Sequence, residues 1–316
     1  MIYISLFLVS LIVTLLVRYY TNKKNILDIP NARSSHDVPV PRGGGVAIVI
    51  TFYIGLFYFR NSVEASLFFA LLGAVPIAIV GMTDDIVTLS AKVRLLIQSL
   101  SALLALYLLG GVTKVDFIIF EMNGWWVNIL AFFIIMWLTN LYNFLDGIDG
   151  YAASQAVIVG LGMYIFFADS LGLVIVASGL GFLLFNWHQA SIFMGDVGST
   201  TLGFIFAIFL LHDTGNGNIY IWLILLSLFW FDATLTLIRR YVNSETLSQA
   251  HKKHAYQRLT QAGWSHSKVV LYAIVINLLF IMLMYSFENH TWLFILNLIT
   301  LYGIVKYIDR KKGFNT

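Results

Sequence analysis

The sequence has no cysteine among its 316 residues, which excludes disulfides, thiolate metal ligands and a cysteine nucleophile. Charged residues make up only 11% of the chain, whereas a soluble globular protein carries about 25%. A formal net charge of +3 is too small to indicate a nucleic-acid partner. Hydrophobic residues reach 59% and the mean hydropathy is +0.83. This composition indicates an integral membrane protein.

Apolar segments follow one another along the chain, most of them close to the roughly 20 residues that a membrane-spanning helix needs. We therefore predict an all-α, polytopic membrane protein that forms a single domain over residues 1–316. The eleven predicted spans lie near residues 2–20, 43–60, 66–83, 93–111, 125–142, 151–168, 170–187, 199–212, 218–238, 268–286 and 291–308. Of these, 199–212 is the shortest.

Lysine and arginine in the short loops predict the orientation, because basic residues are enriched on the cytoplasmic side. With the N-terminus outside and the C-terminus cytoplasmic, Arg60 and Lys114 are the exceptions among 19 basic residues. The cytoplasmic loops then lie near residues 20–43, 84–92, 143–150, 188–198 and 239–267. Two of them are long, and long loops often carry function.

Five carboxylates fall on this predicted cytoplasmic face, within three short motifs. Acids at the end of apolar helices indicate a metal ion, a proton path or a phosphorylated substrate. Gly147 and Gly150 predict that the helix before the second motif opens into a turn. The motifs are Asp84-Asp85, Asn143-Phe-Leu-Asp146-Gly-Ile-Asp149-Gly150 and Phe193-Met-Gly-Asp196-Val-Gly198-Ser199.

Charge repulsion favours a cation among these acids, because two carboxylates about 4 Å apart repel by roughly 4 kcal/mol at an effective dielectric of 20. Oxygen ligands without cysteine favour Mg²⁺, or Mn²⁺, over zinc. A structural interpretation stays open for each motif. Asp84-Asp85 fit a solvated helix end and the second motif fits a polar turn. Ser199 or Thr200 in the third could be a helix N-cap.

Basic segments on the same face could bind phosphate. In Pro41-Arg42-Gly43-Gly44-Gly45 the backbone N–H groups could form an anion nest beside Arg42, or the stretch could be a flexible hinge. The run from His251 to Arg258 offers charge, hydrogen-bond donors and an aromatic ring, or is a polybasic lipid-facing loop. Four further histidines at span ends need no functional interpretation: His188, His212, His266 and His290.

The motifs, in this order, resemble the polyprenyl-phosphate N-acetylhexosamine-1-phosphate transferase family. That resemblance implies transfer of an N-acetylhexosamine-1-phosphate from a UDP-sugar to undecaprenyl phosphate, with release of UMP and a need for Mg²⁺ (Mn²⁺ is an alternative). It also implies a bacterial inner-membrane enzyme with its active site on the cytoplasmic face. A homodimer stays open.

The resemblance also implies roles for individual residues. Asp196, with Asp85, resembles the metal ligands, and Asp84 resembles the base for the lipid phosphate. Phe193 resembles a ring near the uracil, and Arg94 a group that meets the lipid phosphate. Asn143, Asp146 and Asp149 resemble groups that position the nucleotide and the diphosphate. The other implied site residues are Arg42, Gly43, Gly44, His254, Tyr256, Gln257 and Arg258.

One segment departs from the family pattern. Related enzymes carry two or three clustered histidines where this chain has His254-Ala-Tyr256-Gln257. The pattern is similar to the WbpL-like branch that initiates O-antigen or capsule, within lipopolysaccharide biosynthesis. The alternatives are a phospho-N-acetylmuramoyl-pentapeptide transferase within the family and an ion-coupled transporter outside it. The sugar, GlcNAc, GalNAc or a 6-deoxy form, stays open.

Overall fold

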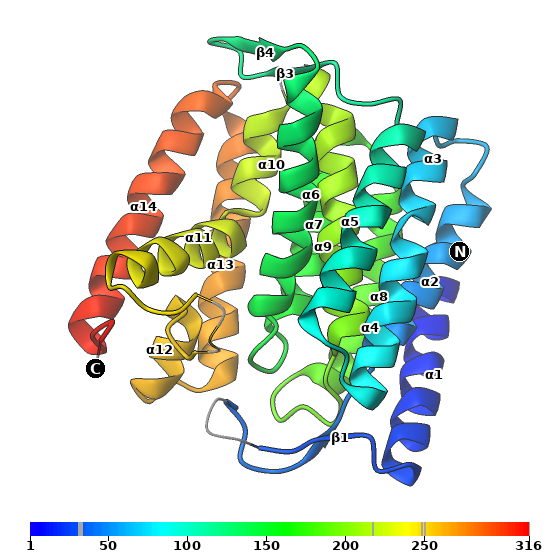
Figure 1. The fold of residues 1–316 in the computed structure, drawn as a ribbon, viewed down its shortest axis with the longest axis vertical. Coiled ribbons are helices and arrows are strands. Elements are labelled where there is room, and N and C mark those ends of the chain that lie inside the picture. The colour runs from blue at the N-terminus through cyan, green and yellow to red at the C-terminus, as the bar shows by residue number, and fades with distance from the viewer. Residues whose placement is uncertain (31–33, 217, 248, 250, 316) are drawn as a thin grey trace.

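The computed structural model describes residues 1–30, 34–216, 218–247, 249 and 251–315. Within them it is a bundle of long helices with two very short sheets (Figure 1). The helices are α1 (Ile2–Lys23), α2 (Gly45–Tyr58), α3 (Ala65–Leu72), α4 (Ala74–Val87), α5 (Ala91–Leu108), α6 (Trp126–Phe144), α7 (Tyr151–Phe167), α8 (Ser170–Asn186), α9 (Asp196–Asp213), α10 (Ile219–Leu225), α11 (Ser227–Val242), α12 (Ala255–Gln261), α13 (His266–Ser286) and α14 (His290–Lys311), with a 3-10 turn, η1 (Thr214–Asn216). The strands are β1 (Leu27–Asp28), β2 (Val40–Pro41), β3 (Lys114–Asp116) and β4 (Glu121–Asn123).

The all-α, polytopic membrane architecture predicted from the sequence is confirmed. Within the described residues, 7 helices are long and apolar enough to cross a membrane, or 8 when the bent pair α10–α11 is taken as one span. The shorter apolar helices α2, α7 and α8 accompany them. Each of the eleven predicted segments coincides with a helix or a pair of helices. The number of crossings and their orientation stay predictions.

Two of the predicted spans are interrupted. The segment 66–83 breaks at Gly73 between α3 and α4, and the segment 218–238 bends by 76° between α10 and α11. Figure 1 shows α11 running across the bundle beside α14. At the bend, Gln155 donates its Nε2–H to the Leu225 carbonyl over 2.8 Å, and Asn277 donates to Gln155 over 2.8 Å. These two bonds satisfy polar groups at the break, which apolar surroundings would otherwise leave unpaired.

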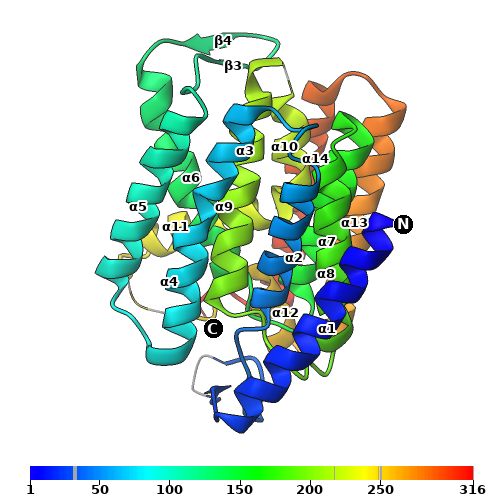
Figure 2. The same cartoon turned by 90° about the vertical axis from the view of Figure 1, so that its right-hand side faces the viewer.

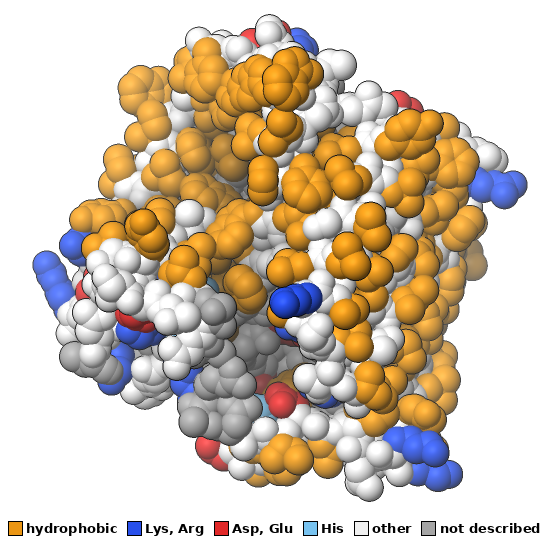
Figure 3. All heavy atoms as spheres, in the orientation of Figure 1, with side chains coloured by type: hydrophobic (Ala, Val, Ile, Leu, Met, Phe, Trp, Pro, Cys, Tyr) orange, Lys and Arg blue, Asp and Glu red, His pale blue; other side chains and the backbone are white. Residues whose placement is uncertain are grey.

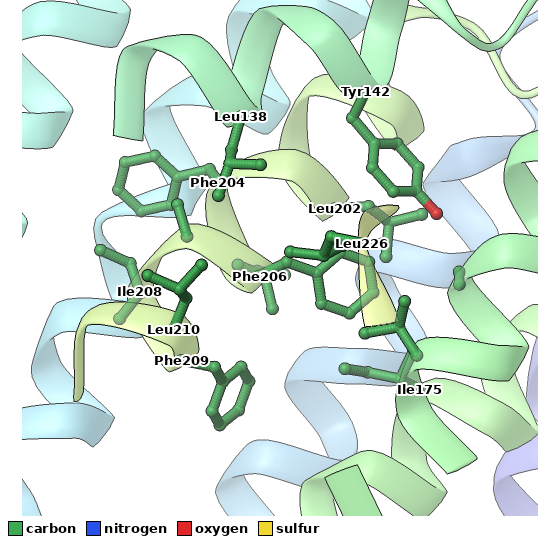
Figure 4. Close-up of a cluster of buried hydrophobic side chains, with 14 of the residues drawn as sticks. Leu138, Tyr142, Ile175, Leu202, Phe204, Phe206, Ile208, Phe209, Leu210 and Leu226 are labelled. Carbon is green, nitrogen blue, oxygen red and sulfur yellow. The ribbon is translucent and has the colours of Figure 1, made fainter. Parts of the chain in front are cut away.

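Helix α9 forms the centre of the bundle (Figure 2). Its residues from Val197 to Leu211 are all buried, and its phenylalanines pack against Tyr142 and neighbouring side chains (Figure 4). The sequence predicted a helix from residue 199 with Ser199 or Thr200 as a possible N-cap, and that boundary is wrong. Helix α9 begins at Asp196, after Gly195 as N-cap, so both hydroxyls lie inside the helix and donate to the carbonyls four residues before them.

The two ends of the bundle differ. One end carries the β3–β4 hairpin, whereas the other carries the β1–β2 segment, α12 and the loops with the acidic motifs (Figures 1 and 2). Hydrophobic side chains dominate the upper and middle surface in Figure 3, and Lys and Arg gather mostly in its lower half. This distribution matches a membrane-embedded body with one polar end, and the acidic motifs lie at that end.

Candidate active site

A cavity of about 310 Å³ opens at the polar end of the bundle. Four of the five predicted carboxylates line it, and they come from the end of α4, the 145–150 loop and the start of α9. In the view of Figure 3 the surface is hollowed in its lower part, with acidic side chains at the hollow. The sequence-predicted residues that line the cavity are Arg42, Asp85, Asn143, Asp146, Asp149, Phe193, Asp196 and Gln257.

Asp85 and Asp196 lie together at the start of α9. The Asp85 carboxylate accepts the backbone N–H of Asp196 over 3.0 Å and that of Val197 over 3.3 Å. An acid at a helix N-terminus satisfies donors that lack intrahelical partners and interacts favourably with the helix dipole. Gly195, at φ +75°, permits this approach, because a Cβ at this position would overlap the Asp85 carboxylate.

Arg94 joins two acids beside the cavity. One guanidinium nitrogen, Nη1, donates to Asp84 over 2.9 Å and to Asp196 over 2.7 Å. Asp84 also accepts the Leu89 N–H and does not line the cavity. Of the adjacent pair Asp84-Asp85, Asp85 therefore faces the cavity, whereas Asp84 reaches it only through Arg94. Arg94 itself lines a small crevice with Asp196 and Thr200.

The glycine segment before α2 does not form the anion nest that the sequence suggested. Gly44 donates its N–H to the Phe193 carbonyl over 2.9 Å, and Gly45 donates to the Met194 carbonyl over 2.8 Å. Neither donor is available to an anion, and neither Gly43 nor Gly44 lines the cavity. The segment instead pairs with the chain before α9, and Arg42 projects into the cavity from it.

The second motif opens into a loop, as Gly147 and Gly150 predicted, because α6 ends at Phe144. Asn143 accepts a hydrogen bond from Ser199 over 2.8 Å, which ties α6 to α9. Burial, together with the negative charges of Asp196, Asp85 and Asp149, raises the pKa of Asp146 to about 8. The repulsion expected from the sequence is therefore present, and a cation among these carboxylates would relieve it.

Asp149 is surrounded differently from the other acids. Its Oδ2 atom lies 2.7 Å from Nδ1 of His188 and 3.2 Å from Nδ1 of His266. It also accepts the Ala190 N–H over 3.3 Å. Burial alone raises the pKa of Asp149, but the hydrogen bonds from His266 and His188 outweigh this and lower it. Asp149 is therefore a carboxylate fixed by imidazoles.

An aromatic surface forms another wall of the cavity. The ring of His36 meets the ring of Phe193 edge-on, with centroids 4.8 Å apart, and both line the cavity. The Nε2 atom of His36 approaches Asp28 within 3.8 Å. Next to them, Arg42 has a buried Nε–H without a hydrogen-bond partner among the described residues. A planar ring and an anion could therefore be accommodated side by side.

The 243–265 segment brings only part of its predicted residues to the cavity. Gln257 lines it, whereas His254 is buried beside Asp232, with its Nδ1 atom 3.7 Å from Oδ1. Tyr256 donates its hydroxyl to the Phe144 carbonyl over 3.1 Å and lines a second, apolar cavity. Arg258 turns toward Asp309 at 2.6 Å and is nearly inaccessible. His254, predicted as a catalytic residue, and Tyr256 and Arg258, predicted as substrate-binding residues, therefore do not line this cavity.

Several cavity residues were missed by the sequence interpretation. His251, which the sequence placed in a basic run without giving it a role in the site, lines the cavity, whereas His254 does not. His36 also lines it, from the long 20–43 loop that the sequence marked as functional only in general. His266 was dismissed as a residue at a span end, yet it lines the cavity. Its position as the first residue of a helix, on the same predicted face as the acids, was a usable signal.

Comparison with known proteins defines the family. Residues 67–213 match the model of glycosyl transferase family 4. A probable undecaprenyl-phosphate N-acetylglucosaminyl 1-phosphate transferase of Bacillus subtilis is 36% identical over 292 residues, covering 86% of this chain and 80% of that protein. The chain belongs to glycosyl transferase family 4. The resemblance drawn from the acidic motifs is thereby confirmed at the level of the family.

Two further relatives show the breadth of the match. An undecaprenyl-phosphate alpha-N-acetylglucosaminyl 1-phosphate transferase of Thermotoga maritima is 26% identical, covering 86% of this chain and 87% of the relative. A phospho-N-acetylmuramoyl-pentapeptide-transferase of Thermotoga petrophila is 30% identical, covering 76% and 82%. Membership of this family therefore indicates that the chain is a membrane-embedded sugar-1-phosphate transferase.

Proposed function

We propose that this glycosyl transferase family 4 member transfers an N-acetylhexosamine-1-phosphate from a UDP-sugar to undecaprenyl phosphate. The observation that carries the proposal is the cavity of carboxylates, arginine and aromatic rings at the polar end of a membrane bundle. Three kinds of group match a UDP-sugar donor: cationic side chains for its phosphates, acidic side chains for an accompanying metal ion, and aromatic rings for its nucleobase. A site at the membrane surface suits a water-soluble donor and a lipid acceptor.

The carboxylates that line the cavity fit Mg²⁺, because they offer oxygen atoms only and repel one another in its absence. Asp196 and Asp85 would hold the ion, with Asp146 beside them. When bound, Mg²⁺ neutralises charge on the diphosphate and on the leaving UMP. Arg42, with its unpartnered Nε–H, adds positive charge at the same cavity. Arg94 fixes the orientation of Asp196 through their 2.7 Å hydrogen bond.

The proposed reaction is a direct displacement. An oxygen of the lipid phosphate attacks the phosphorus that carries the sugar, the bond from that phosphorus to UMP breaks, and UMP leaves with the electron pair. A phosphate monoester has its second pKa near 6, so most acceptor molecules need no base at neutral pH. Asp85 lines the cavity as a proposed metal ligand, whereas Asp84 acts on the site only through Arg94. Incubation with UDP-sugar alone should yield no phosphorylated enzyme.

The decisive experiment measures UMP release from the purified protein with undecaprenyl phosphate, a panel of UDP-sugars, and either Mg²⁺, Mn²⁺ or chelator. We expect release with one UDP-N-acetylhexosamine and none with chelator. UDP-N-acetylmuramoyl-pentapeptide belongs in the panel, because one relative carries that name. Its use as the preferred donor would replace the proposed substrate. Absence of release with every donor would contradict the proposed function.

We place the enzyme in the bacterial inner membrane, with eleven spans, the N-terminus outside and the cavity on the cytoplasmic face. The distribution of lysine and arginine supports this orientation, and a cytoplasmic site would meet nucleotide sugars where they are made. The product would start a lipid-linked surface polysaccharide, such as an O-antigen. Labelling of single cysteines at Arg60 and at Lys252 from outside intact cells tests the orientation. Only the first should react.

A further inference from the structure

The two histidines on Asp149 are the feature that the proposed reaction leaves unexplained. His188 lies in the loop after α8, and His266 is the first residue of α13. They are 39 and 117 residues from Asp149 in sequence, yet their rings lie 5.2 Å apart around one carboxylate. Neither takes part in the chemistry described above, and nothing in the sequence motif of Asp149 calls for them.

Three groups converge on the same oxygen. The Nδ1 atoms of His188 and His266 lie 2.7 and 3.2 Å from Oδ2 of Asp149, and the Ala190 N–H donates to it over 3.3 Å. Nδ1 of His266 also accepts the backbone N–H of Asp149 over 3.4 Å, so this ring holds both the backbone and the carboxylate. Within the described part of the chain, no hydrogen bond reaches Oδ1. A carboxylate can accept several hydrogen bonds on each oxygen. Fixing one oxygen fully therefore sets the direction of the other while leaving its acceptor capacity for a ligand.

The position of Asp149 in the cavity indicates which part of the donor it meets. Asp149 lines the same cavity as Phe193 and His36. A negative carboxylate repels phosphate, so the diphosphate belongs at the end with Arg42 and the proposed metal ligands. The nucleoside carries N–H and O–H donors that a carboxylate accepts, and a planar base that aromatic rings can contact.

We propose that His188 and His266 are positioning residues that hold Asp149 to accept a hydrogen bond from the nucleoside of the donor. This inference rests on the proposed function, because it names the part of the same site that recognises the UDP moiety. The histidines contact Asp149 and act only through it. Their removal should weaken donor binding without disturbing the lipid acceptor.

The test compares His266→Leu with His266→Asn, and His188→Leu with His188→Asn, in the full-length purified protein. The side-chain N–H of Asn lies close to the position of the imidazole Nδ1–H, so Asn can still donate to Asp149 whereas Leu cannot. We expect each Leu variant to raise the KM for the UDP-sugar by about tenfold, with the KM for undecaprenyl phosphate unchanged. We expect the Asn variants to stay within about threefold of the wild type.

A matched control is His290→Leu, since His290 is also the first residue of a helix, α14, but at the opposite end of the bundle. It should leave both KM values unchanged. Calorimetric binding of UMP alone provides a second readout that needs no turnover, and the Leu variants should lose about tenfold in affinity.

Several outcomes would overturn the inference. Equal impairment of the Asn and Leu variants, or a fall in kcat at constant KM, would assign the histidines a purely structural role. One equivalent of zinc in the purified protein, lost in the histidine variants and required for turnover, would make the cluster a metal site instead. Wild-type turnover with unaffected histidine variants would refute this inference alone. No UMP release or UMP binding by the wild type would refute it together with the proposed function.

Discussion

Two regions reach the same cavity but are held in opposite ways. Helices α2 and α4 are held against α9, which with α4 carries carboxylates of the site, by close contacts between backbones, because a Cβ added to Gly45 would overlap Gly198 and one added to Gly81 would overlap Val197. The 243–265 segment is held by charges: Arg240 contacts Glu245 and carbonyls of residues 246, 247 and 249. The first region should be sensitive to volume and the second to charge and salt.

The largest effect should follow from Asp196→Asn, which keeps the size of the side chain and removes its charge. If Asp196 holds the metal, turnover should fall by about 10³-fold, because a catalytic metal stabilises the transition state by several kcal/mol and each 1.36 kcal/mol is a factor of ten. UMP release measures this. Glu288→Gln, exposed at the opposite end, is the control and should leave turnover unchanged. A residual activity above a tenth of the wild type would contradict the metal role.

Gly45→Ala tests the backbone-packed region. The new methyl group would meet the backbone of Gly198 and the Met194 carbonyl, so α2 must move away from α9. Overpacking of this kind typically costs about 1–3 kcal/mol of stability. We expect a lower melting temperature in detergent, and also reduced turnover, since Asp196 begins α9, the helix against which α2 packs. Gly303→Ala in α14, where a Cβ meets nothing within 4 Å, is the matched control. Equal melting temperatures would show that the two helices can separate freely.

Asp84→Asn tests whether the adjacent acids Asp84 and Asp85 have different roles. Asp84 keeps Arg94 in place but does not line the cavity, and Arg94 retains Asp196 when Asp84 is neutral. We therefore expect turnover to fall by only about tenfold, the cost of one weakened hydrogen bond to a charged group. Asp85→Asn, measured beside it, should cost at least ten times more. Equal losses in UMP release would restore the sequence-based role of Asp84 as the base.

The same contrast explains which features of the fold and the site could be predicted from the sequence. The predictions that succeeded are local in sequence: eleven apolar segments, and acids at the end of helices that all reach one face. The anion nest failed because Gly44 and Gly45 find carbonyl partners near Phe193, about 150 residues away, which their own motif does not specify. Arg258 was assigned to substrate binding because the sequence does not show that Asp309, in the last helix, lies beside it. The role of His188 and His266 could not be predicted, because it depends on three distant segments of the chain meeting at Asp149.

Asp309→Asn should give the smallest effect and the clearest sign of the charge-held region. Asp309 accepts two hydrogen bonds from Arg239 at 3.0 Å and one from Arg258 at 2.6 Å, and Phe314 lies against both guanidinium groups. Neutralising Asp309 should loosen the contact between α12 and α14. Gln257 belongs to α12, so its position at the cavity should become less fixed. We expect about a threefold fall in turnover, because a partly exposed ion pair contributes about 1 kcal/mol or less.

Salt and protease distinguish this loosening from a general loss of stability. Trypsin should cleave after Lys252 or Lys253 faster in the Asp309→Asn variant, and 0.5 M salt should narrow the difference from the wild type by screening the remaining charges. Glu121→Gln, which breaks the exposed pair with Lys114 at the opposite end, should change neither rate. If Gly45→Ala proved as salt-dependent as Asp309→Asn, both regions would be held by charge and the contrast between them would fail.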